Sequence, residues 1–166
     1  MTPKREARKL RSEAYNVDGK MRLPIDVAEI AKELNVKVEV RELPSSVAGF
    51  IIKEANESFP VIYVNSGDGP QRRRFTIAHE LGHYIQNRDS KEMAYVDNRD
   101  EMASTGTDPK ERWCNAFAAE LLMPESVVKK YWAEGWEFER IRELLDVSKA
   151  ALANRLNSLG LIQHAG

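Results

Sequence analysis

The sequence predicts an α+β fold in which a three-stranded antiparallel sheet packs on helices and a small helical tail follows. Three observations support this fold class. Short segments between residues 36 and 65 alternate apolar and polar side chains, which is typical of strands with one wet face. A long segment at residues 71–88 has apolar side chains at helical spacing. Residues 125–166 contain short helical segments separated by turn residues.

The composition is that of an ordinary globular domain. The 166 residues include 25 basic and 26 acidic side chains and have a net charge of −1, so no overall field favours nucleic acid or an anionic membrane. Cys114 is the only cysteine, which excludes an internal disulfide and a zinc ribbon. No apolar run approaches the roughly 20 residues that span a bilayer, and the charged amino terminus lacks a signal-peptide pattern. The sequence therefore predicts a cytoplasmic protein.

Two helices and three strands are predicted in the first part of the chain. Residues 3–17 have apolar side chains near helical spacing, and we expect a packing helix there. A second helix is expected to start at Pro24 and to stop at Asn35. Strands are expected at residues 36–40, 47–53 and 60–65. Because their connections are short, an antiparallel meander is the simplest arrangement.

The segment RRRFTIAHELGHY at residues 72–84 carries the pattern H-E-x-x-H. His79 and His83 are four positions apart, so on a helix both imidazoles can reach one metal ion. Glu80 lies about 100° around the helix, beside the metal, where it can hold a water. Gly82 costs a helix about 1 kcal/mol relative to alanine, which indicates close packing at that point. The pattern is typical of zinc peptidases, with the histidines as ligands and the glutamate as general base.

A catalytic zinc site needs a third protein ligand. In the helix that Asp108 opens, Glu111 and Cys114 fall on the apolar face, whereas Glu120 lies opposite Glu111. Glu111 is ranked first as ligand, and Cys114 a distant second, because a lone cysteine on such a face is more often a core residue. Glu111 can instead close a capping box with Asp108. Asn115 lies four residues after Glu111 and is a candidate for orienting the Glu111 carboxylate by a hydrogen bond, without binding the metal itself.

Three further features have less definite assignments. Residues 89–107 are predicted to form a long loop, with at most a helical turn, that can cover the site. Tyr84 and Tyr95 are candidates for stabilising an oxyanion. His164, the only other histidine, is expected to be a surface side chain near the carboxyl end.

The tail has the outline of a helix-turn-helix. Helices are expected at residues 125–133, 137–145 and 149–159. Ser148 can cap the last of them. Lys149 and Arg155 supply little positive charge for neutralising phosphates. A structural or protein-docking role is therefore favoured over DNA binding.

The order of these motifs resembles the ImmA/IrrE family of metallopeptidases. The matching segments are LPIDVAEIAKELNV, VAGFI, VIYVN, RRRFTIAHELGHY, ERWCNAFAAELLMPE and VSKAALANRLNSLGLI. The resemblance implies a zincin-like metallopeptidase core at residues 1–124 and a helix-turn-helix-like subdomain at residues 125–166. It also implies that Glu111 is the third zinc ligand and Glu80 the catalytic base.

Members of that family cleave helix-turn-helix repressors of the Xre type, often encoded beside them in mobile elements, prophages or stress regulons. The resemblance therefore implies a zinc-dependent endopeptidase whose partner is an Xre-type repressor encoded nearby. Cleavage of the repressor would induce gene expression. Two alternatives stay open: a zincin-like binding module that regulates a repressor without cutting it, and a DNA-binding regulator that uses the tail.

Overall fold

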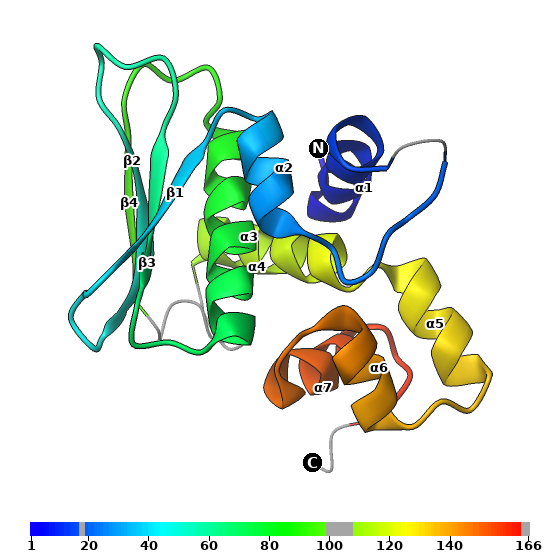
Figure 1. The fold of residues 1–166 in the computed structure, drawn as a ribbon. Coiled ribbons are helices and arrows are strands. Elements are labelled where there is room, and N and C mark those ends of the chain that lie inside the picture. The colour runs from blue at the N-terminus through cyan, green and yellow to red at the C-terminus, as the bar shows by residue number, and fades with distance from the viewer. Residues whose placement is uncertain (17–18, 99–107, 164–166) are drawn as a thin grey trace.

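The computed structural model describes residues 1–16, 19–98 and 108–163. Residues 99–107, the second half of the predicted loop, and His164 lie outside this part. Figure 1 shows the arrangement of the elements. In chain order they are α1 (Pro3–Ala14), α2 (Val27–Glu33), β1 (Lys37–Arg41), β2 (Val47–Lys53), β3 (Val61–Asn65), α3 (Pro70–Gln86), β4 (Met93–Asn98), α4 (Pro109–Leu122), α5 (Glu125–Ala133), α6 (Phe138–Leu145) and α7 (Lys149–Ser158).

The sheet has four strands in the order β1-β3-β2-β4. Strand β2 is antiparallel to β3 and to β4, but β1 is parallel to β3. Helices α2 and α3 lie along one face of this sheet (Figure 1). The α+β class is therefore confirmed, whereas the prediction of a three-stranded antiparallel meander is wrong.

The meander prediction fails at the connection between β1 and β2. Strand β3 lies between these two strands, and the buried Asn65 at its end holds the connection in place. The Asn65 amide donates to the carbonyl oxygens of Pro44 at 3.2 Å and Val47 at 2.9 Å, and its oxygen accepts from the Gly67 amide at 2.9 Å. These bonds satisfy backbone groups of the connection without a direct β1–β2 pair.

Strand β4 lies where the sequence predicted a loop. Its side chains alternate, because Met93 and Asp97 are buried and Tyr95 is half-buried, while Val96 is 58% exposed. The alternation is short and its last inward position is a carboxylate, so the hydrophobic pattern alone gave a weak signal. The strand brings Asp97 against α3.

The second helix begins three residues later than predicted. Asp26 caps it, with Oδ1 accepting from the Glu29 amide at 3.1 Å, and Pro24 lies before the cap. The helix gives way at Asn35, whose φ of 60° lies in the left-handed region, so the predicted stop is confirmed.

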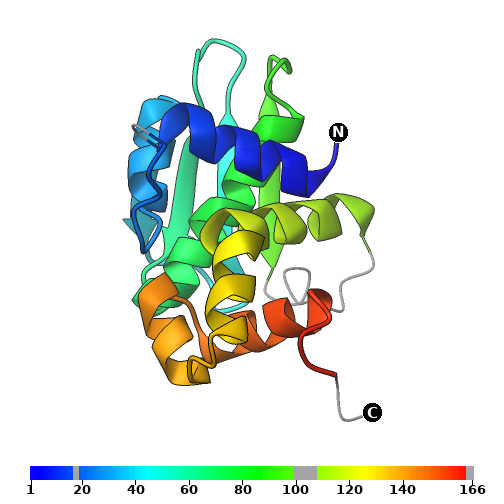
Figure 2. The same cartoon turned by 90° about the vertical axis from the view of Figure 1, so that its right-hand side faces the viewer.

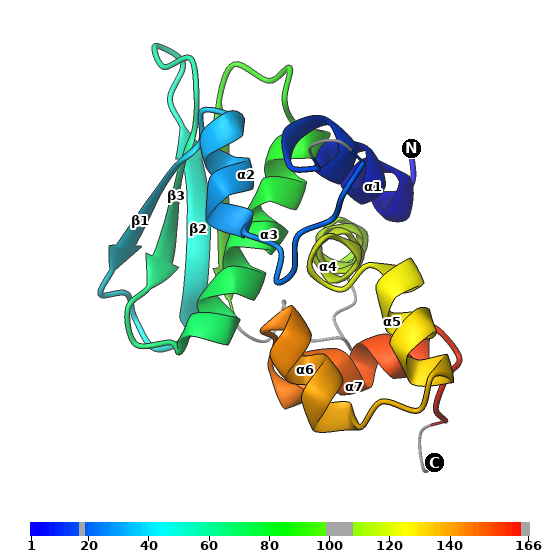
Figure 3. The ribbon, with the colours of Figure 1, turned by 45° about the vertical axis from the view of Figure 1, so that its right-hand side comes forward.

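Helix α4 runs through the middle of the helical part of the molecule. It packs most extensively against α3 and then against α1. Figure 3 shows α4 nearly end-on, surrounded by α1, α3 and the α5–α7 group, and Figure 2 shows α1 and that group on either side of it. In the ranges that the structure describes, no helix is both long and apolar enough to cross a membrane.

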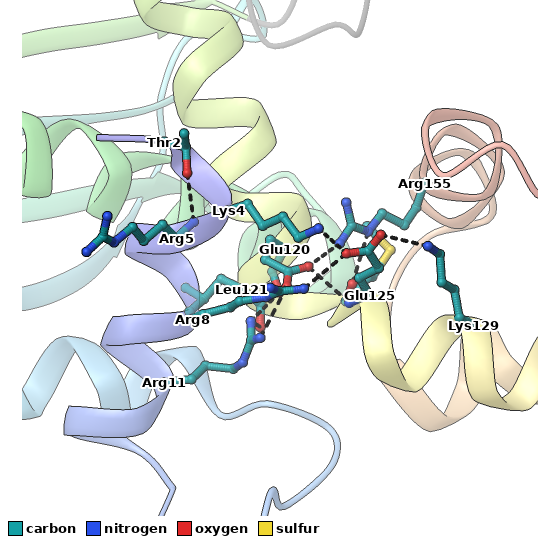
Figure 4. Close-up of polar contacts among 11 residues, drawn as sticks. Thr2, Lys4, Arg5, Arg8, Arg11, Glu120, Leu121, Glu125, Lys129 and Arg155 are labelled. Carbon is teal, nitrogen blue, oxygen red and sulfur yellow. Dashed lines mark hydrogen bonds and ion pairs between the residues drawn. The ribbon is translucent and has the colours of Figure 1, made fainter.

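Glu120 of α4 is buried, although the sequence placed it opposite Glu111 and away from the apolar face of this helix. Its Oε1 accepts from Arg8 Nε at 3.0 Å and from Arg11 Nη2 at 3.4 Å, and its Oε2 pairs with Arg155 Nη2. Figure 4 shows these side chains converging from α1, α4 and α7. Helix α4 thus buries two carboxylates, those of Glu111 and Glu120, on opposite faces. A helix with a single apolar stripe would bury only one face.

The turn between α6 and α7 is hydrogen-bonded to a side chain of α3. Ser148 caps α7 as predicted, with its hydroxyl accepting from the Ala151 amide at 3.1 Å. Arg74 of α3 donates to the carbonyl oxygens of Leu145 at 3.2 Å and Asp146 at 3.1 Å. Whether the tail is a separate subdomain stays a prediction.

Candidate metal centre

The centre of α3 carries three buried polar residues. His79, Glu80 and His83 have no exposed surface. The two imidazoles lie on the same side of the helix because they are four residues apart, with ring centroids 5.1 Å apart and planes at 75°. The sequence therefore forms the expected helix and turns both rings inward.

Gly82 allows α3 and α4 to approach closely, so the packing predicted for this glycine is confirmed. A Cβ on Gly82 would lie 3.2 Å from Cys114 Cα and 3.2 Å from Phe117 Cδ1. Glycine avoids both contacts because it has no side chain. Glu111 is one helical turn before Cys114, so the close approach puts its carboxylate beside the histidines.

The Glu111 carboxylate bridges the two imidazoles. Its Oε2 lies 2.8 Å from His79 Nε2, and its Oε1 lies 3.0 Å from His83 Nε2. It does not close a capping box, because Asp108 caps α4 by accepting from the Lys110 amide at 2.8 Å. The Glu111 carboxylate therefore lies beside both histidines, and its role as a metal ligand stays a prediction.

Asn115 contacts the centre through His79 rather than through Glu111. Its Oδ1 lies 2.8 Å from His79 Nδ1. Because an amide oxygen only accepts, Nδ1 carries a proton, and Nε2 is the ring nitrogen that faces the carboxylates. Metal-bound imidazoles are commonly held in this way by a bond at the other ring nitrogen. The sequence predicted that Asn115 orients the Glu111 carboxylate, whereas in the structure its side chain contacts an imidazole.

Asp97 completes the cluster and was missed by the sequence analysis. It is fully buried, and its Oδ1 lies 3.3 Å from His79 Nε2 and 3.2 Å from His83 Nε2. The available signal was the alternation of Met93, Tyr95 and Asp97, which puts a carboxylate at an inward position of a strand. A carboxylate is seldom found there without a partner.

The cluster favours positive charge at the imidazoles. Burial lowers the pKa of His79, but hydrogen bonds to Asp97 and Glu111 outweigh it and the net shift is upward. The pKa of His83 is also raised, because bonds to Asp97, Cys114 and Glu111 exceed the effect of burial. Two buried carboxylates thus surround the two Nε2 atoms and call for a cation between them.

Glu80 is adjacent to this cluster but has no hydrogen-bond donor. Among the described residues, neither of its carboxylate oxygens accepts a hydrogen bond. Burial raises the pKa of Glu80 well above its usual value, and the neighbouring Asp97 carboxyl raises it further. A buried carboxylate without a donor is ready to take up a proton or a water molecule.

The donor atoms fit a divalent metal. His79, His83, Asp97 and Glu111 each offer one ligand atom, and these four atoms lie within 4.8 Å of one another. Imidazole nitrogen and carboxylate oxygen are donors that zinc accepts. Asn115 engages His79 Nδ1, so Nε2 is the ring nitrogen that faces the carboxylates, and a metal ion can take the place of a proton there.

The other predicted candidates lie around this cluster. Cys114 is buried, and its thiol donates to Gln86 Oε1 at 3.8 Å, although it also forms a possible ligand group with the two histidines. Tyr95 stacks on the His83 ring at 4.4 Å and donates its hydroxyl to Asn87 Oδ1 at 3.1 Å. Tyr84 is buried, and the Arg88 guanidinium lies over its ring.

Comparisons with known proteins identify sequence relatives. The family model described as IrrE N-terminal-like domain, Peptidase_M78, matches residues 31–157. The radiation response metalloprotease IrrE of Deinococcus radiodurans is 41% identical over 73 residues, which is 41% of this chain and 20% of that protein. The uncharacterized immunity region protein 2 of Bacillus phage phi105 is 30% identical over 103 residues, 62% of this chain and 61% of that protein. The chain thus spans 20% and 61% of the lengths of these two relatives.

A solved structure has a similar fold. A Mycobacterium tuberculosis transcriptional regulator aligns with a TM-score of 0.63 over 93% of this chain and 46% of its own length. At 16% sequence identity, this likeness concerns the fold alone.

Proposed function

Because the chain belongs to the ImmA/IrrE family of metallopeptidases, whose IrrE N-terminal-like domain matches residues 31–157, we propose that it is a zinc-dependent endopeptidase that cleaves a helix-turn-helix repressor. The observation that carries this proposal is the buried cluster in which two imidazole nitrogens and carboxylate oxygens converge within 4.8 Å. Glu80 lies beside this cluster, fully buried and without a hydrogen-bond donor among the described residues. That combination serves hydrolysis better than it serves a structural metal site.

The chain's own residues divide the work of such a reaction. His79, His83 and Glu111 hold the ion, and Asn115 keeps the His79 ring in its ligating tautomer. Bound zinc would act as a Lewis acid that activates water and polarises a peptide carbonyl. Glu80 takes the proton from that water and passes it to the leaving amine.

The choice between Glu111 and Cys114 as third ligand has a direct test. Glu111→Gln should weaken zinc binding by roughly tenfold or more, because a neutral amide is a poorer ligand than a carboxylate. Cys114→Ala should leave the affinity near that of the parent protein. Competition with a chromophoric chelator measures both constants, and circular dichroism checks the fold. Equal losses in the two variants would assign the thiol to the metal.

Two features support a protein substrate of the repressor type. One relative is named as an immunity region protein of a bacteriophage, which fits the repressor substrate that the family resemblance implies. Among the described residues β4 pairs only with β2, so its outer edge can receive an extended peptide by β-sheet hydrogen bonding. A repressor substrate would place the reaction in the cytoplasm, and residues 125–166 would act in protein docking.

The test is direct cleavage. Zinc-loaded protein is incubated with the helix-turn-helix repressor encoded beside its own gene, and the products are separated on a denaturing gel. We expect two fragments that disappear with a chelator and return when zinc is restored. An intact repressor in a stable complex with the protein would contradict the proposal and favour a binding module.

Of the two cations that the DNA-binding alternative requires, Lys149 and Arg155, the structure leaves only Lys149 available. Arg155 pairs with the buried Glu120, and its Nε donates to the Met123 carbonyl at 3.0 Å. This guanidinium is therefore committed to the interior of the protein. Lys149 remains exposed, but a single cation is little for a DNA-reading helix.

The non-proteolytic alternative has one observation in its favour. Asp97 adds a fourth protein donor to the cluster, and zinc sites with four protein ligands are usually structural. The role of Asp97 therefore separates the two readings.

A further inference from the structure

Asp97 stands out in the cluster because each imidazole faces two carboxylates. His79 Nε2 lies 2.8 Å from Glu111 Oε2 and 3.3 Å from Asp97 Oδ1. His83 Nε2 lies 3.0 Å from Glu111 Oε1 and 3.2 Å from Asp97 Oδ1. The chain therefore presents four donors to one ion, whereas a hydrolytic zinc site uses three and keeps one position for water.

We propose that Asp97 is an inhibitory fourth ligand, which occupies the water position and must be withdrawn before the chain can hydrolyse a peptide. This inference rests on the proposed function, because it concerns the state of the same centre. It makes the described arrangement the latent form of the enzyme.

The contacts of the two carboxylates differ in a way that makes Asp97 the removable one. Glu111 gives each imidazole its own oxygen, at the shorter distances. Asp97 reaches both rings with the single atom Oδ1, and its Oδ2 has no hydrogen-bond partner among the described residues. Withdrawal of either carboxylate breaks two contacts with the imidazoles, but those of Asp97 are the longer and therefore the weaker ones.

The elements that carry the two carboxylates also make Asp97 the easier one to withdraw. Glu111 stands on α4, which the close approach at Gly82 locks against α3. Asp97 stands on β4, at the edge of the sheet, where the described residues pair it with β2 alone. The β2–β4 register shifts between Val47 and Gly49, directly opposite Asp97. Such irregularities loosen the ladder locally and are frequent beside active sites.

Withdrawal of Asp97 would also free the space that Glu80 needs. The Glu80 carboxylate is in contact with that of Asp97, and neither Glu80 oxygen has a donor among the described residues. A general base must reach a water directly to take its proton. Asp97 contacts both imidazoles and the Glu80 carboxylate, so it competes for the space in which a water next to Glu80 would lie. Glu80 gains a proton donor only when Asp97 leaves.

The contacts of Tyr95 keep the side chain of Asp97 on the face of β4 that is turned toward the cluster. The Tyr95 ring stacks on the His83 imidazole at 4.4 Å, with an angle of 8° between the planes, and its hydroxyl donates to Asn87 Oδ1 at 3.1 Å. Since side chains two residues apart on a strand share a face, these contacts hold Asp97 on the side of α3. Rotation of the Asp97 side chain alone, or a shift of β4 beyond Tyr95, would open the position.

The experiment measures access to the metal rather than peptidase activity. The protein is loaded with Co²⁺, and its visible absorption is followed during titration with acetohydroxamate, which needs an open coordination position. We expect Asp97→Ala and Asp97→Asn to bind the hydroxamate about tenfold or more tightly than the parent chain, because a ligand that competes for the position is gone. Asn98→Ala, an exposed position on the same strand, should titrate like the parent chain.

Three outcomes overturn the inference. Equal hydroxamate affinity of the parent chain and both Asp97 variants would mean that Asp97 does not occupy the position. Complete loss of Co²⁺ binding in folded Asp97 variants would make Asp97 an obligatory ligand. Failure of the parent chain itself to bind Co²⁺ or Zn²⁺ would instead remove the proposed function, and with it this inference. If Asp97→Ala does not fold, the isosteric Asp97→Asn decides the matter.

Discussion

Glu80→Gln should reduce peptide hydrolysis by roughly 10² to 10⁴-fold, because the amide cannot take a proton from water or pass it to the leaving amine. The metal should stay bound, since Glu80 offers no donor atom to the four-membered cluster. Neither oxygen of Glu80 accepts a hydrogen bond from a described residue, so the isosteric amide breaks none. The variant should therefore keep its fold while losing its rate.

The measurement is the initial rate of repressor cleavage with zinc in excess, together with the zinc content of the purified variant. Glu143→Gln is the matched control, because the same change is made at an exposed glutamate of α6 and should alter neither quantity. A full cleavage rate in Glu80→Gln would remove Glu80 as general base. Loss of metal in that variant would mean that Glu80 contributes to holding the ion.

Glu120→Ala should lower the free energy of unfolding by about 3 to 5 kcal/mol, the cost typical of breaking a buried ion pair on one side. Glu120 is 1% exposed and Arg11 is 4% exposed, so the arginine would be left in the interior without its counter-charge. Arg155, half-buried on α7, loses the same partner. The Glu125 amide also loses its acceptor, Glu120 Oε2, at 3.0 Å. Urea unfolding followed by circular dichroism measures the change.

Glu125→Ala provides the comparison within the same network. Its carboxylate contacts Arg8 at 3.0 Å and Lys129 at 2.9 Å, and it also pairs with Lys4, but the cationic side chains are about half exposed. We expect a loss below about 1 kcal/mol, as for surface ion pairs. Similar losses in the two variants would show that burial of the Glu120 cluster does not determine its contribution. Both losses of stability would then have to be attributed to the charges alone.

The pH dependence of this network follows from Glu125. Hydrogen bonds from Lys4 and Lys129 lower the pKa of its carboxyl to about 2 in the folded protein. Because the folded pKa is depressed, the small stabilisation is present above the unfolded pKa and is lost as the pH falls toward 2.

The sequence by itself determined the parts of the site that follow from spacing along one helix. His79 and His83 share a face of α3 because four residues make about one turn, and this would hold in any surroundings. Gly82 indicated close packing, and Glu111 could be singled out from the apolar face of α4. The order of motifs identified the family.

Only the tertiary structure decided which segments became neighbours. The same alternation that predicts β1, β2 and β3 is compatible with several strand orders, and the parallel pairing of β1 with β3 depends on contacts far apart in the chain. Asp97 and Glu120 were misjudged for the same reason. Each is a carboxylate whose burial is tolerated because partners arrive from other elements, the two imidazoles of α3 in one case and arginines of α1 and α7 in the other. Local periodicity reports which face a side chain occupies, whereas the free energy of burying a charge is set by what the fold places against that face.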